Sequence, residues 1–532
     1  MNATQTVVVQ PLTFPSTRDA PAGERLAAID IGSNSFHMVV AESAPNGGYR
    51  LLGREREMVR LGKTGLGDGA LSEAAMQDGL EALAKMTTIA RLRGVERVVA
   101  VATSAVREAS NGADFLARVK ALTGLDVQLL TGVEEGRLIY RAVREVVDLG
   151  PETAVIVDIG GGSTEWITTQ AGELDQVVSL ILGSLRCAAE LKGDPATPAS
   201  LERLRRKAEK RLAEAVPRGP VERLIATSGT AVCCADLIDY FAGRPWKEVS
   251  GAREVRVKDL AQLVERLRPL KRRQLADLPP VGGPRSDSLL SGAVLLQAFV
   301  AHAGVDRFQV SDRALREGLV LAAFGQPIPP AAEPEDLRRR QVLQLAGRSE
   351  SVYRHNLQTA RLAVRLFDLT ASLHGLGARE REWLEYAALL HDIGYSIHYK
   401  GHHKHAYYLI TNAVLDAFDQ REIEIIANLA RYHRGATPKP GHPNLASLKP
   451  WQQKTIRKLA ALLRVADSLD RTHASRVEEL YCAIRGHKVT LEVLSRYAVD
   501  LELEAAREHV HFFENVFGRA LRLRQGLEIA GA

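Results

Sequence analysis

Cysteine and long apolar runs are both scarce in this sequence, and each scarcity narrows the class of protein. Only four of the 532 residues are cysteine, and none has the pair spacing of a metal site. This usage favours a reducing cytoplasm. No run of about 18 apolar residues is present, so no membrane span is expected. The first 24 residues lack a basic start followed by an apolar stretch, and we expect a flexible tail there instead of a secretory signal.

The rest of the composition is that of an ordinary soluble protein. Hydrophobic residues make up 45% and charged residues 25% of the chain, and the net charge is +6. A basic balance suits polyanionic partners, but it does not by itself indicate specific nucleic-acid binding. At about 150 residues per domain, the length predicts three or four domains.

The order of the predicted elements divides the chain. Before a Pro-rich stretch, short apolar runs alternate with amphipathic helices; the runs are 26–29, 97–102, 127–130, 154–157 and 224–226, and the helices include 73–93 and 201–215. After it, helices are predicted at 354–367, 380–390, 422–430 and 451–469, with a few strands near 489–503. All histidines except His37 and His302 also follow this stretch. The pattern predicts an α/β part and then a separate helical domain.

Two similar turns are the most informative feature of the α/β part. Asp30-Ile-Gly-Ser-Asn-Ser follows the predicted strand at 26–29, and Asp158-Ile-Gly-Gly-Gly-Ser-Thr follows the one at 154–157. Short apolar, β-branched segments come next in both cases, at 36–41 and 165–169. Each turn is therefore expected to join two strands of a hairpin, whereas a Walker or dinucleotide loop opens a helix.

The residues of these turns suit a phosphate and a cation together. Glycine lets backbone N–H groups approach an anion closely, and hydroxyl and amide side chains add neutral donors. The expected phosphate contacts are Gly32, Ser33, Asn34 and Ser35 in the first turn and Gly160, Gly161, Gly162, Ser163 and Thr164 in the second. Asp30 and Asp158 are expected to hold hydrated Mg²⁺, which in turn binds phosphate oxygens. A third glycine turn at 226–230 either lines the same cleft or is a plain strand-to-helix turn.

If the bound phosphate is hydrolysed, a carboxylate must orient or deprotonate water. Glu134 and Glu135 both begin an amphipathic helix. Thr131 is placed to cap this helix and Glu134 to complete a capping box, which leaves Glu135 free. The helix dipole is expected to lower the pKa of Glu135 and keep it ionised. Arg107, after the strand at 97–102, offers a planar fork for phosphate; the plain alternatives are solvated acids and a surface arginine.

Together these segments resemble the exopolyphosphatase / guanosine pentaphosphate phosphohydrolase (Ppx/GppA) family. The resemblance covers 25–325 and rests on segments 28–37, 102–107, 132–137 and 157–165, supported by Ser228-Gly-Thr and Ser311-Asp-Arg-Ala-Leu-Arg-Glu-Gly. It implies an α/β fold with two ribonuclease-H-like lobes of the actin-like ATPase superfamily, at 25–148 and 149–325, around a cleft.

The same resemblance implies an activity and an assembly. Terminal orthophosphate would be removed from polyphosphate, or the 5′ γ-phosphate from pppGpp, with Mg²⁺ or Mn²⁺. Glu135 is implied as the catalytic carboxylate, Arg107 as a substrate contact, and Asp30 and Asp158 as the metal-linked aspartates. A cytoplasmic homodimer is the expected assembly.

Beyond the linker predicted at 326–335, the helical domain expected at 336–532 resembles the HD phosphohydrolase superfamily over 350–475. Its predicted metal ligands are His355, the adjacent pair His391 and Asp392, and Asp467, on three separate helices. They suit Mn²⁺, Fe²⁺, Zn²⁺ or Mg²⁺. A second ion has three alternative ligands, His402, His403 or His405, together with His433. The alternative is an inherited fold that shapes a polyphosphate channel and a dimer interface without chemistry.

Three other functions fit part of the pattern. A pppGpp phosphohydrolase of the stringent response acts on the same kind of bond, and a strong preference for the nucleotide would distinguish it. A polyphosphate or nucleotide sensor with a dead site conflicts with the presence of Glu135 and Arg107. A kinase or chaperone ATPase shares the fold, but a kinase needs an acceptor pocket that the sequence does not reveal.

Overall fold

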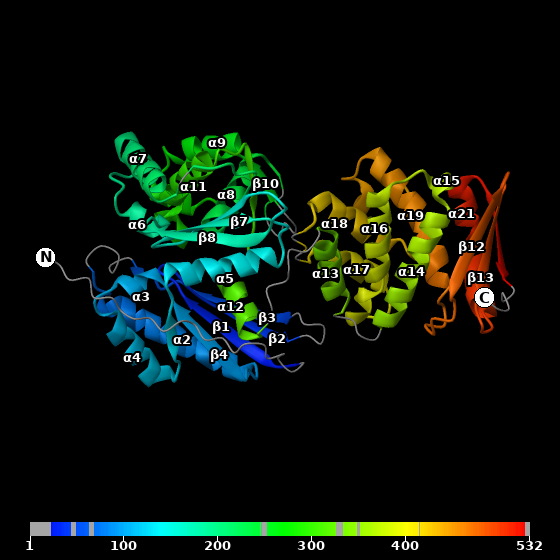
Figure 1. The fold of residues 1–532 in the computed structure, drawn as a ribbon, viewed down its shortest axis with the longest axis horizontal. Coiled ribbons are helices and arrows are strands. Elements are labelled where there is room, and N and C mark those ends of the chain that lie inside the picture. The colour runs from blue at the N-terminus through cyan, green and yellow to red at the C-terminus, as the bar shows by residue number, and fades with distance from the viewer. Residues whose placement is uncertain are drawn as a thin grey trace. The chain divides into compact units, whose positions relative to one another are not determined.

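The computed structural model describes most of the chain, in two compact units. The described residues are 23–43, 49–62, 69–216, 218–244, 246, 253–325, 334–347, 352–413, 415 and 417–526. The described residues before Glu335 form the first unit, and those from Glu335 form the second (Figure 1). Nearly all of the tail predicted at 1–24, and positions 326–333 of the predicted linker, lie outside the described residues.

The first lobe is built on a five-stranded sheet with the order β3-β2-β1-β4-β5. Its strands are β1 (Arg25–Ile31), β2 (Phe36–Ser43), β3 (Tyr49–Glu57), β4 (Arg97–Ala102) and β5 (Val127–Leu129). β1, β2 and β3 form an antiparallel meander, whereas β4 pairs parallel to β1 and β5 parallel to β4. β1 and β2 are buried along most of their length, which fits their nearly continuous apolar sequence.

Three helices cover one face of this sheet (Figure 1). They are α2 (Glu73–Leu92), α3 (Ser104–Glu108) and α4 (Gly112–Thr123). Ser72 caps α2 by accepting a hydrogen bond from the backbone N–H of Ala75 at 3.2 Å. Leu83, Met86 and Phe115 bury the apolar faces of these helices against the sheet. This packing fixes the carboxyl ends of β1 and β4, where the predicted site residues lie.

The second lobe repeats the same plan with six strands in the order β10-β11-β9-β6-β7-β8. They are β6 (Ala154–Ile159), β7 (Thr164–Gln170), β8 (Glu173–Leu180), β9 (Arg223–Thr227), β10 (Arg253–Arg256) and β11 (Arg307–Val310). Again an antiparallel meander, β6-β7-β8, continues into parallel strands β9 and β11. The repeated order is the one expected for two ribonuclease-H-like lobes.

The helices of the second lobe are α6 (Ser184–Ala188), α7 (Pro198–Ala215), α8 (Ser228–Phe241), α9 (Val257–Leu267), α10 (Arg272–Ala276) and α11 (Leu289–Ala303), with the 3-10 turn η1 (Pro284–Asp287). α11 is apolar on nearly every side and is buried at the centre of this lobe. Helices that are apolar all round belong in a core, so α11 serves as the support for α6, α7 and α9.

Two helices join the lobes. α5 (Gly132–Arg144) packs on β7 and β8 of the second lobe, and α12 (Leu315–Ala323) returns from the second lobe to pack on α5, β1 and β2. Gly318 permits this approach, because a Cβ there would lie 1.9 Å from the carbonyl oxygen of Leu138. α12 thus belongs to a core cluster that contains residues of both lobes, on β1 and β2 as well as on β6, β7 and β9. The sequence analysis assigned α12 to the second lobe, and the lobe boundary at 325 stays a prediction.

The second unit is mainly helical. Its helices are α13 (Pro334–Ala346), α14 (Tyr353–Leu369), α15 (Ala371–His374), α16 (Ala378–Leu390), α17 (His402–Thr411), α18 (Gln420–Arg431), α19 (Pro450–Ser468), α20 (Asp500–Arg507) and α21 (Val510–Phe517), with short 3-10 turns η3 (Ile393–Ser396) and η4 (Pro443–Leu445). A small sheet, β12 (Glu479–Arg485), β13 (Lys488–Leu494) and β14 (Ala520–Gln525), completes it. One shared core connects the helices and the sheet.

Most predicted elements are confirmed within one to three residues of their bounds. The main exception is the strand region near 489–503, where β13 ends at Leu494 and residues 500–507 are helical. No helix in the described ranges is both long enough and apolar enough to cross a membrane.

Candidate active site

Both Asp-Ile-Gly turns line one cleft of about 470 Å³ in the first unit. The chain passes Asp30 at the end of β1 and returns as β2, and it passes Asp158 near the end of β6 and returns as β7, so each turn joins a hairpin as predicted. The turns approach each other closely. A Cβ added to Gly161 would lie 3.1 Å from Cβ of Ser33 and 3.6 Å from the backbone nitrogen of Asn34. A larger residue at 161 would therefore push the turns apart.

All the predicted phosphate contacts line this cleft except Gly162 and Thr164. The Thr164 hydroxyl donates to the carbonyl oxygen of Leu182, and the Gly162 carbonyl accepts from Nε of Arg186 at 3.0 Å. These two residues hold the second turn in place and do not face the cleft. In the first turn, the hydroxyls of Ser33 and Ser104 lie 3.0 Å apart and connect the turn to α3.

The two aspartates lie where burial disfavours the ionised form of their carboxyl groups. Oδ1 of Asp30 and Oδ1 of Asp158 are buried, and neither has a hydrogen-bond partner among the described residues. The pKa of each is raised from 3.8 to about 7, first by burial and then by the carboxylate of Glu135. Buried carboxylate oxygens without donors are the ligands that a hard divalent cation such as Mg²⁺ prefers, so these residues fit the expected cation.

The start of α5 confirms the predicted capping box. The Thr131 hydroxyl accepts from the backbone N–H of Glu134 at 3.2 Å, and the Glu134 carboxylate accepts from the N–H of Thr131 at 2.8 Å. Glu135 is left to line the cleft, where it is 6% exposed. Burial raises the pKa of Glu135, although Arg107 opposes the shift. The expected lowering of this pKa by the helix dipole is wrong, because the loss of hydration outweighs it.

Arg107 contacts Glu135 and is not itself among the residues that line the cleft. Its guanidinium forms an ion pair with the Glu135 carboxylate and donates to the carbonyl oxygen of Leu130 at 2.5 Å. The sequence analysis expected Arg107 to contact the substrate. In this structure its visible role is to hold the carboxylate of Glu135.

Glu165 is a cleft residue to which the sequence analysis gave no role. It lies directly opposite Asp158 in the β6–β7 register, is 1% exposed and lines the cleft. Its Oε1 accepts from the Ser179 hydroxyl at 2.9 Å. Burial, followed by Glu135 and Asp158, raises the pKa of Glu165 well above its usual value.

A set of arginines, which we call the basic wall, also lines the cleft. It consists of Arg54, Arg56, Arg285 and Arg316. Burial and this positive field lower the pKa of His37 to about 3, so the imidazole stays neutral and hydrogen-bonds with the Ser35 hydroxyl at 2.8 Å. The third glycine turn, through Ser228, Gly229 and Thr230, lines the cleft as well. The cleft thus combines a cluster of carboxylates with a wall of guanidinium groups.

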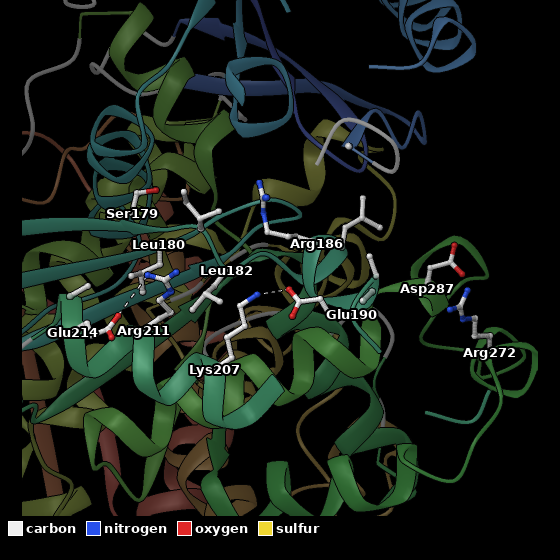
Figure 2. A pocket seen from close by; sticks show the side chains of 16 residues that line it. Ser179, Leu180, Leu182, Arg186, Glu190, Lys207, Arg211, Glu214, Arg272 and Asp287 are labelled. Atoms are coloured by element: carbon white, nitrogen blue, oxygen red, sulfur yellow. Dashed lines mark hydrogen bonds and ion pairs between the residues drawn. The ribbon is translucent and has the colours of Figure 1, made fainter. Parts of the chain in front are cut away.

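A larger hollow of about 800 Å³ lies against β8, α6 and α7 of the second lobe. Figure 2 shows two ion pairs in this hollow: Lys207 contacts Glu190 at 2.5 Å, and Arg211 contacts Glu214 at 3.7 Å. Aliphatic side chains such as Leu180 make up much of the remaining lining. The smaller cleft, with its unpaired buried carboxylates, is therefore the better candidate for chemistry.

The predicted ligands of the helical unit also converge. Nε2 of His355 lies 3.1 Å from Oδ1 of Asp467 and 3.3 Å from Nε2 of His391. Asp392 lies beside this group, with Oδ2 3.6 Å from Nε2 of His391.

Of the three alternative histidines, one lies beside His433. His402 and His433 form a second cluster with Asp392, whereas His403 and His405 belong to neither cluster that the described residues form.

The chain was compared with known families and solved structures. Residues 39–326 match the model of the Ppx/GppA phosphatase family, and residues 337–507 match that of Ppx/GppA phosphatase, domain III. An exopolyphosphatase from Cytophaga hutchinsonii is 25% identical over 58% of this chain and 100% of its own, with a TM-score of 0.53. A Ppx/GppA family member from Aquifex aeolicus is 28% identical over 56% of this chain and 97% of its own, with a TM-score of 0.49. An exopolyphosphatase-like protein is 23% identical over 56% of this chain and 97% of its own, with a TM-score of 0.53.

These likenesses confirm the predicted fold, in which two actin-like, ribonuclease-H-like α/β lobes are followed by a helical part. The match in the helical part is to domain III of the same phosphatases, and the HD resemblance stays a prediction. The first match alone spans more than half of the chain and includes Arg107, Glu135 and the second turn. The chain therefore belongs to the Ppx/GppA phosphatase family.

Proposed function

We propose that this chain is an exopolyphosphatase that removes orthophosphate processively from the end of inorganic polyphosphate. The observation that carries the proposal is the meeting of both phosphate turns, both turn aspartates and Glu135 in one cleft. The related exopolyphosphatase from Cytophaga hutchinsonii supports the same class of substrate. Hydrolysis of a phosphoanhydride end requires no second acceptor besides water, which fits a cleft of this modest volume.

In this proposal the terminal phosphate lies between the two turns. Backbone N–H groups near Gly32 and Gly160 and the hydroxyls of Ser33 and Ser163 supply neutral donors from both sides. A divalent cation, Mg²⁺ or Mn²⁺, would be held by Asp30 and Asp158 and would neutralise phosphate oxygens.

Glu135 is proposed to orient and deprotonate the attacking water. The water oxygen bonds to the terminal phosphorus, the bond from phosphorus to the bridging oxygen breaks, and a water proton passes to the carboxylate of Glu135. The raised pKa of Glu135 favours this transfer, because a general base works best when its pKa lies near the working pH. The contact with Arg107 keeps the carboxylate in one orientation.

The basic wall is proposed to receive the phosphates next to the terminal one. Arg56 and Arg285 have no carboxylate partner within ion-pair distance among the described residues, so their charge is available to an anion. Guanidinium groups bind phosphate oxygens in pairs of hydrogen bonds. Several guanidinium groups in one cleft favour the binding of a linear polyanion, because each additional phosphate brings another negative charge for them to contact.

A pppGpp phosphohydrolase is the second candidate. The triphosphate of pppGpp ends in the same phosphoanhydride, and every contact proposed above is made to phosphate. A catalytically dead sensor is the third, and the burial of Glu135 in the same cleft as both turns argues against it.

The test is a substrate series combined with one substitution. Release of orthophosphate is measured from polyphosphates of increasing length and from pppGpp, each with Mg²⁺. We expect polyphosphate to be the better substrate by kcat/KM. Glu135→Gln should reduce kcat by about 10²–10⁴-fold, because a general base contributes about that much, while binding of the chain persists.

Glu134→Gln is the matched control. It replaces the neighbouring carboxylate with an amide, which is the same change as in Glu135→Gln. The amide oxygen of glutamine can still complete the capping box, so kcat should stay near that of the unaltered chain. Unchanged turnover in Glu135→Gln contradicts the mechanism. A strong preference for pppGpp instead assigns the second candidate function.

We propose a homodimer and a cytoplasmic location, of which the second is supported by four cysteines that are all free thiols. Sedimentation analysis of the purified chain tests the first. The oxygen-only donors at Asp30 and Asp158 favour Mg²⁺ over softer ions in the cleft.

A further inference from the structure

A buried carboxylate contacts the basic wall of the cleft from within the protein. Glu317 is the third residue of α12, is 2% exposed and is not among the residues that line the cleft. It belongs to the segment Ser311-Asp-Arg-Ala-Leu-Arg-Glu-Gly, to which the sequence analysis gave no role of its own. Burial of a carboxylate costs free energy unless donors compensate its charge, so the donors around Glu317 indicate what it does.

One oxygen of this carboxylate caps α12. Oε2 of Glu317 accepts a hydrogen bond from the backbone N–H of Ala314, the residue before the helix, at 3.1 Å. This is one half of a capping box, and the other half requires a side-chain acceptor, which alanine lacks. The bond keeps the Glu317 carboxylate beside the first turn of α12.

The other oxygen contacts two arginines of the basic wall. Oε1 of Glu317 accepts from Nε of Arg316 at 3.0 Å and from Nη2 of Arg54 at 3.4 Å. Arg54 lies on β3 of the first lobe, whereas Arg316 lies on α12, which the chain reaches after β11 of the second lobe. Both arginines line the cleft, and one buried oxygen outside the cleft lining connects them.

A second carboxylate lies near the remaining terminal nitrogen of Arg54. Oδ2 of Asp312 is 3.9 Å from Nη1 of Arg54, so each terminal nitrogen of this guanidinium faces one carboxylate. The side chain of Asp312 is 39% exposed, and solvent therefore screens its longer contact. The buried Glu317 makes the closer contact and constrains Arg54 more strongly.

The contact with Glu317 leaves part of each guanidinium available to phosphate. It uses Nε of Arg316, whose two terminal nitrogens have no hydrogen-bond partner within the part of the chain that the structure describes. The N–H groups on these two nitrogens form the planar fork that binds phosphate oxygens. A carboxylate that binds Nε therefore orients the fork without covering it.

Orientation before binding increases the affinity of an arginine for phosphate. Arginine is a long side chain that loses much rotamer freedom when a ligand fixes it, and a guanidinium that is already fixed avoids this loss. The negative charge of Glu317 acts in the opposite direction, because it lies near groups that receive phosphate. Two guanidinium groups at hydrogen-bond distance compensate most of that charge, so the effect of orientation is the larger one.

We propose that Glu317 is a positioning residue, which orients the guanidinium groups of Arg54 and Arg316 and thereby sets the affinity of the cleft for the phosphates next to the terminal one. The inference rests on the function proposed for the cleft, in which the basic wall receives those phosphates. Glu317 contacts neither the substrate nor the attacking water. It therefore acts on binding of the chain and not on cleavage of the bond.

The test is Glu317→Gln, with kcat and KM measured for polyphosphates of increasing length. Glutamine keeps an amide oxygen that can cap α12 but lacks the charge that holds the two guanidinium groups. For long chains we expect KM to rise by about tenfold, because two arginines must then be ordered on binding, while kcat changes by less than about twofold. The rise should be smaller for inorganic triphosphate, which offers fewer phosphates to the wall.

Binding is also measured without turnover. In the Glu135→Gln variant polyphosphate stays intact, and adding Glu317→Gln should raise the dissociation constant for long chains by the same factor as KM. Arg54→Gln shows whether Glu317 acts through the wall. On the Arg54→Gln background, Glu317→Gln should add clearly less than its full effect, since residues in one network are not additive.

Glu422→Gln is the matched control in the helical unit. Glu422 is likewise buried, completes the cap of its own helix by accepting from the N–H of Asp419 at 3.2 Å, and binds a guanidinium nitrogen of Arg338 at 2.9 Å. The substitution removes the same charge from the same kind of setting outside the cleft. It should lower the melting temperature but leave KM and its dependence on chain length unchanged.

Three outcomes overturn the proposal. KM for long chains could stay unchanged in Glu317→Gln, or it could fall, which would mean that the charge of Glu317 merely opposes the polyanion. A rise that is equal at every chain length and fully additive with Arg54→Gln would indicate a general loss of structure. Binding of polyphosphate without hydrolysis by the unaltered chain would instead count against the function proposed for the cleft, and the dissociation constants would still decide the role of Glu317.

Discussion

At the scale of single residues, the cleft depends on two aspartates that burial makes hard to ionise. The pKa of Asp30 and that of Asp158 are raised from 3.8 to about 7 in the folded chain. Between pH 3.8 and about pH 7, the folded chain therefore binds more protons at these aspartates than the unfolded chain does. Without a cation, its free energy of unfolding falls as pH rises through that window. Below pH 3.8 this part of the stability is fully present.

A cation at these aspartates competes with those protons. Below pH 7, we expect the dissociation constant for Mg²⁺ to rise by about tenfold per pH unit if binding displaces one proton. If binding displaces a proton from each aspartate, the rise is about a hundredfold per pH unit. The measurement is the rise in melting temperature on adding Mg²⁺, which should be larger at about pH 8 than at about pH 5.5. Asp158→Asn should remove most of that difference. Equal rises at both pH values would contradict the assignment of the cation to Asp30 and Asp158.

Some residues of the cleft could be predicted from the sequence and others could not. Glu135 was found because a capping box is a local pattern that assigns its neighbour, Glu134, to another task. Glu165 and the basic wall were not found, because nothing local marks them. Arg56 lies on β3 and Arg316 on α12, 260 residues later, and only the return of α12 to the first lobe brings them to one cleft.

At the scale of elements, the start of α5 determines where the proposed base lies. Thr131 caps this helix through its hydroxyl, and Glu135 follows within the first turn. Thr131→Ala should lower the free energy of unfolding by about 1 kcal/mol, the usual cost of losing such a cap. It should also lower kcat, because the first turn then holds Glu135 less firmly. Urea unfolding and orthophosphate release measure the two effects.

Thr197→Ala is the control for this prediction. Thr197 caps α7 by accepting from the backbone N–H of Ser200 at 3.3 Å, and it does not line the cleft. We expect a similar loss of stability with little change in kcat. If both variants lose the same activity, a general loss of stability explains the effect, and α5 has no special role in placing Glu135.

Elements were predictable where their pattern is local. The hairpins around the two turns follow from short apolar runs on both sides of a glycine turn, and β2 and β7 lie where those runs predict. The choice among His402, His403 and His405 was not predictable, because it depends on which face of α17 is buried. His402 lies on that face with Ala406 and Ile410, and the other two histidines do not. The region after Leu494 was misjudged because tertiary packing there favours α20 over a strand.

At the scale of the whole molecule, the described residues form two units with separate cores. The core of the helical unit draws on no residue before Val342, whereas the three cores of the first unit contain no residue after Phe324. Units whose cores are separate unfold independently unless a large interface couples them. We therefore expect two heat-absorption peaks in calorimetry of the full chain, each of which responds to its own ligand.

The ligands make this expectation specific. A ligand at 100 times its dissociation constant stabilises the unit that binds it by about 2.7 kcal/mol, which raises the melting temperature of a unit of this size by several degrees. In the Glu135→Gln variant, Mg²⁺ with inorganic triphosphate should raise one peak. Restoring Mn²⁺ to chelator-treated protein should raise the other, because the ligands predicted in the helical unit suit this ion, and His433→Gln should reduce that second rise only. A single peak that moves with either ligand would show that the units unfold as one, and the two sites would then be linked through the stability of the whole chain.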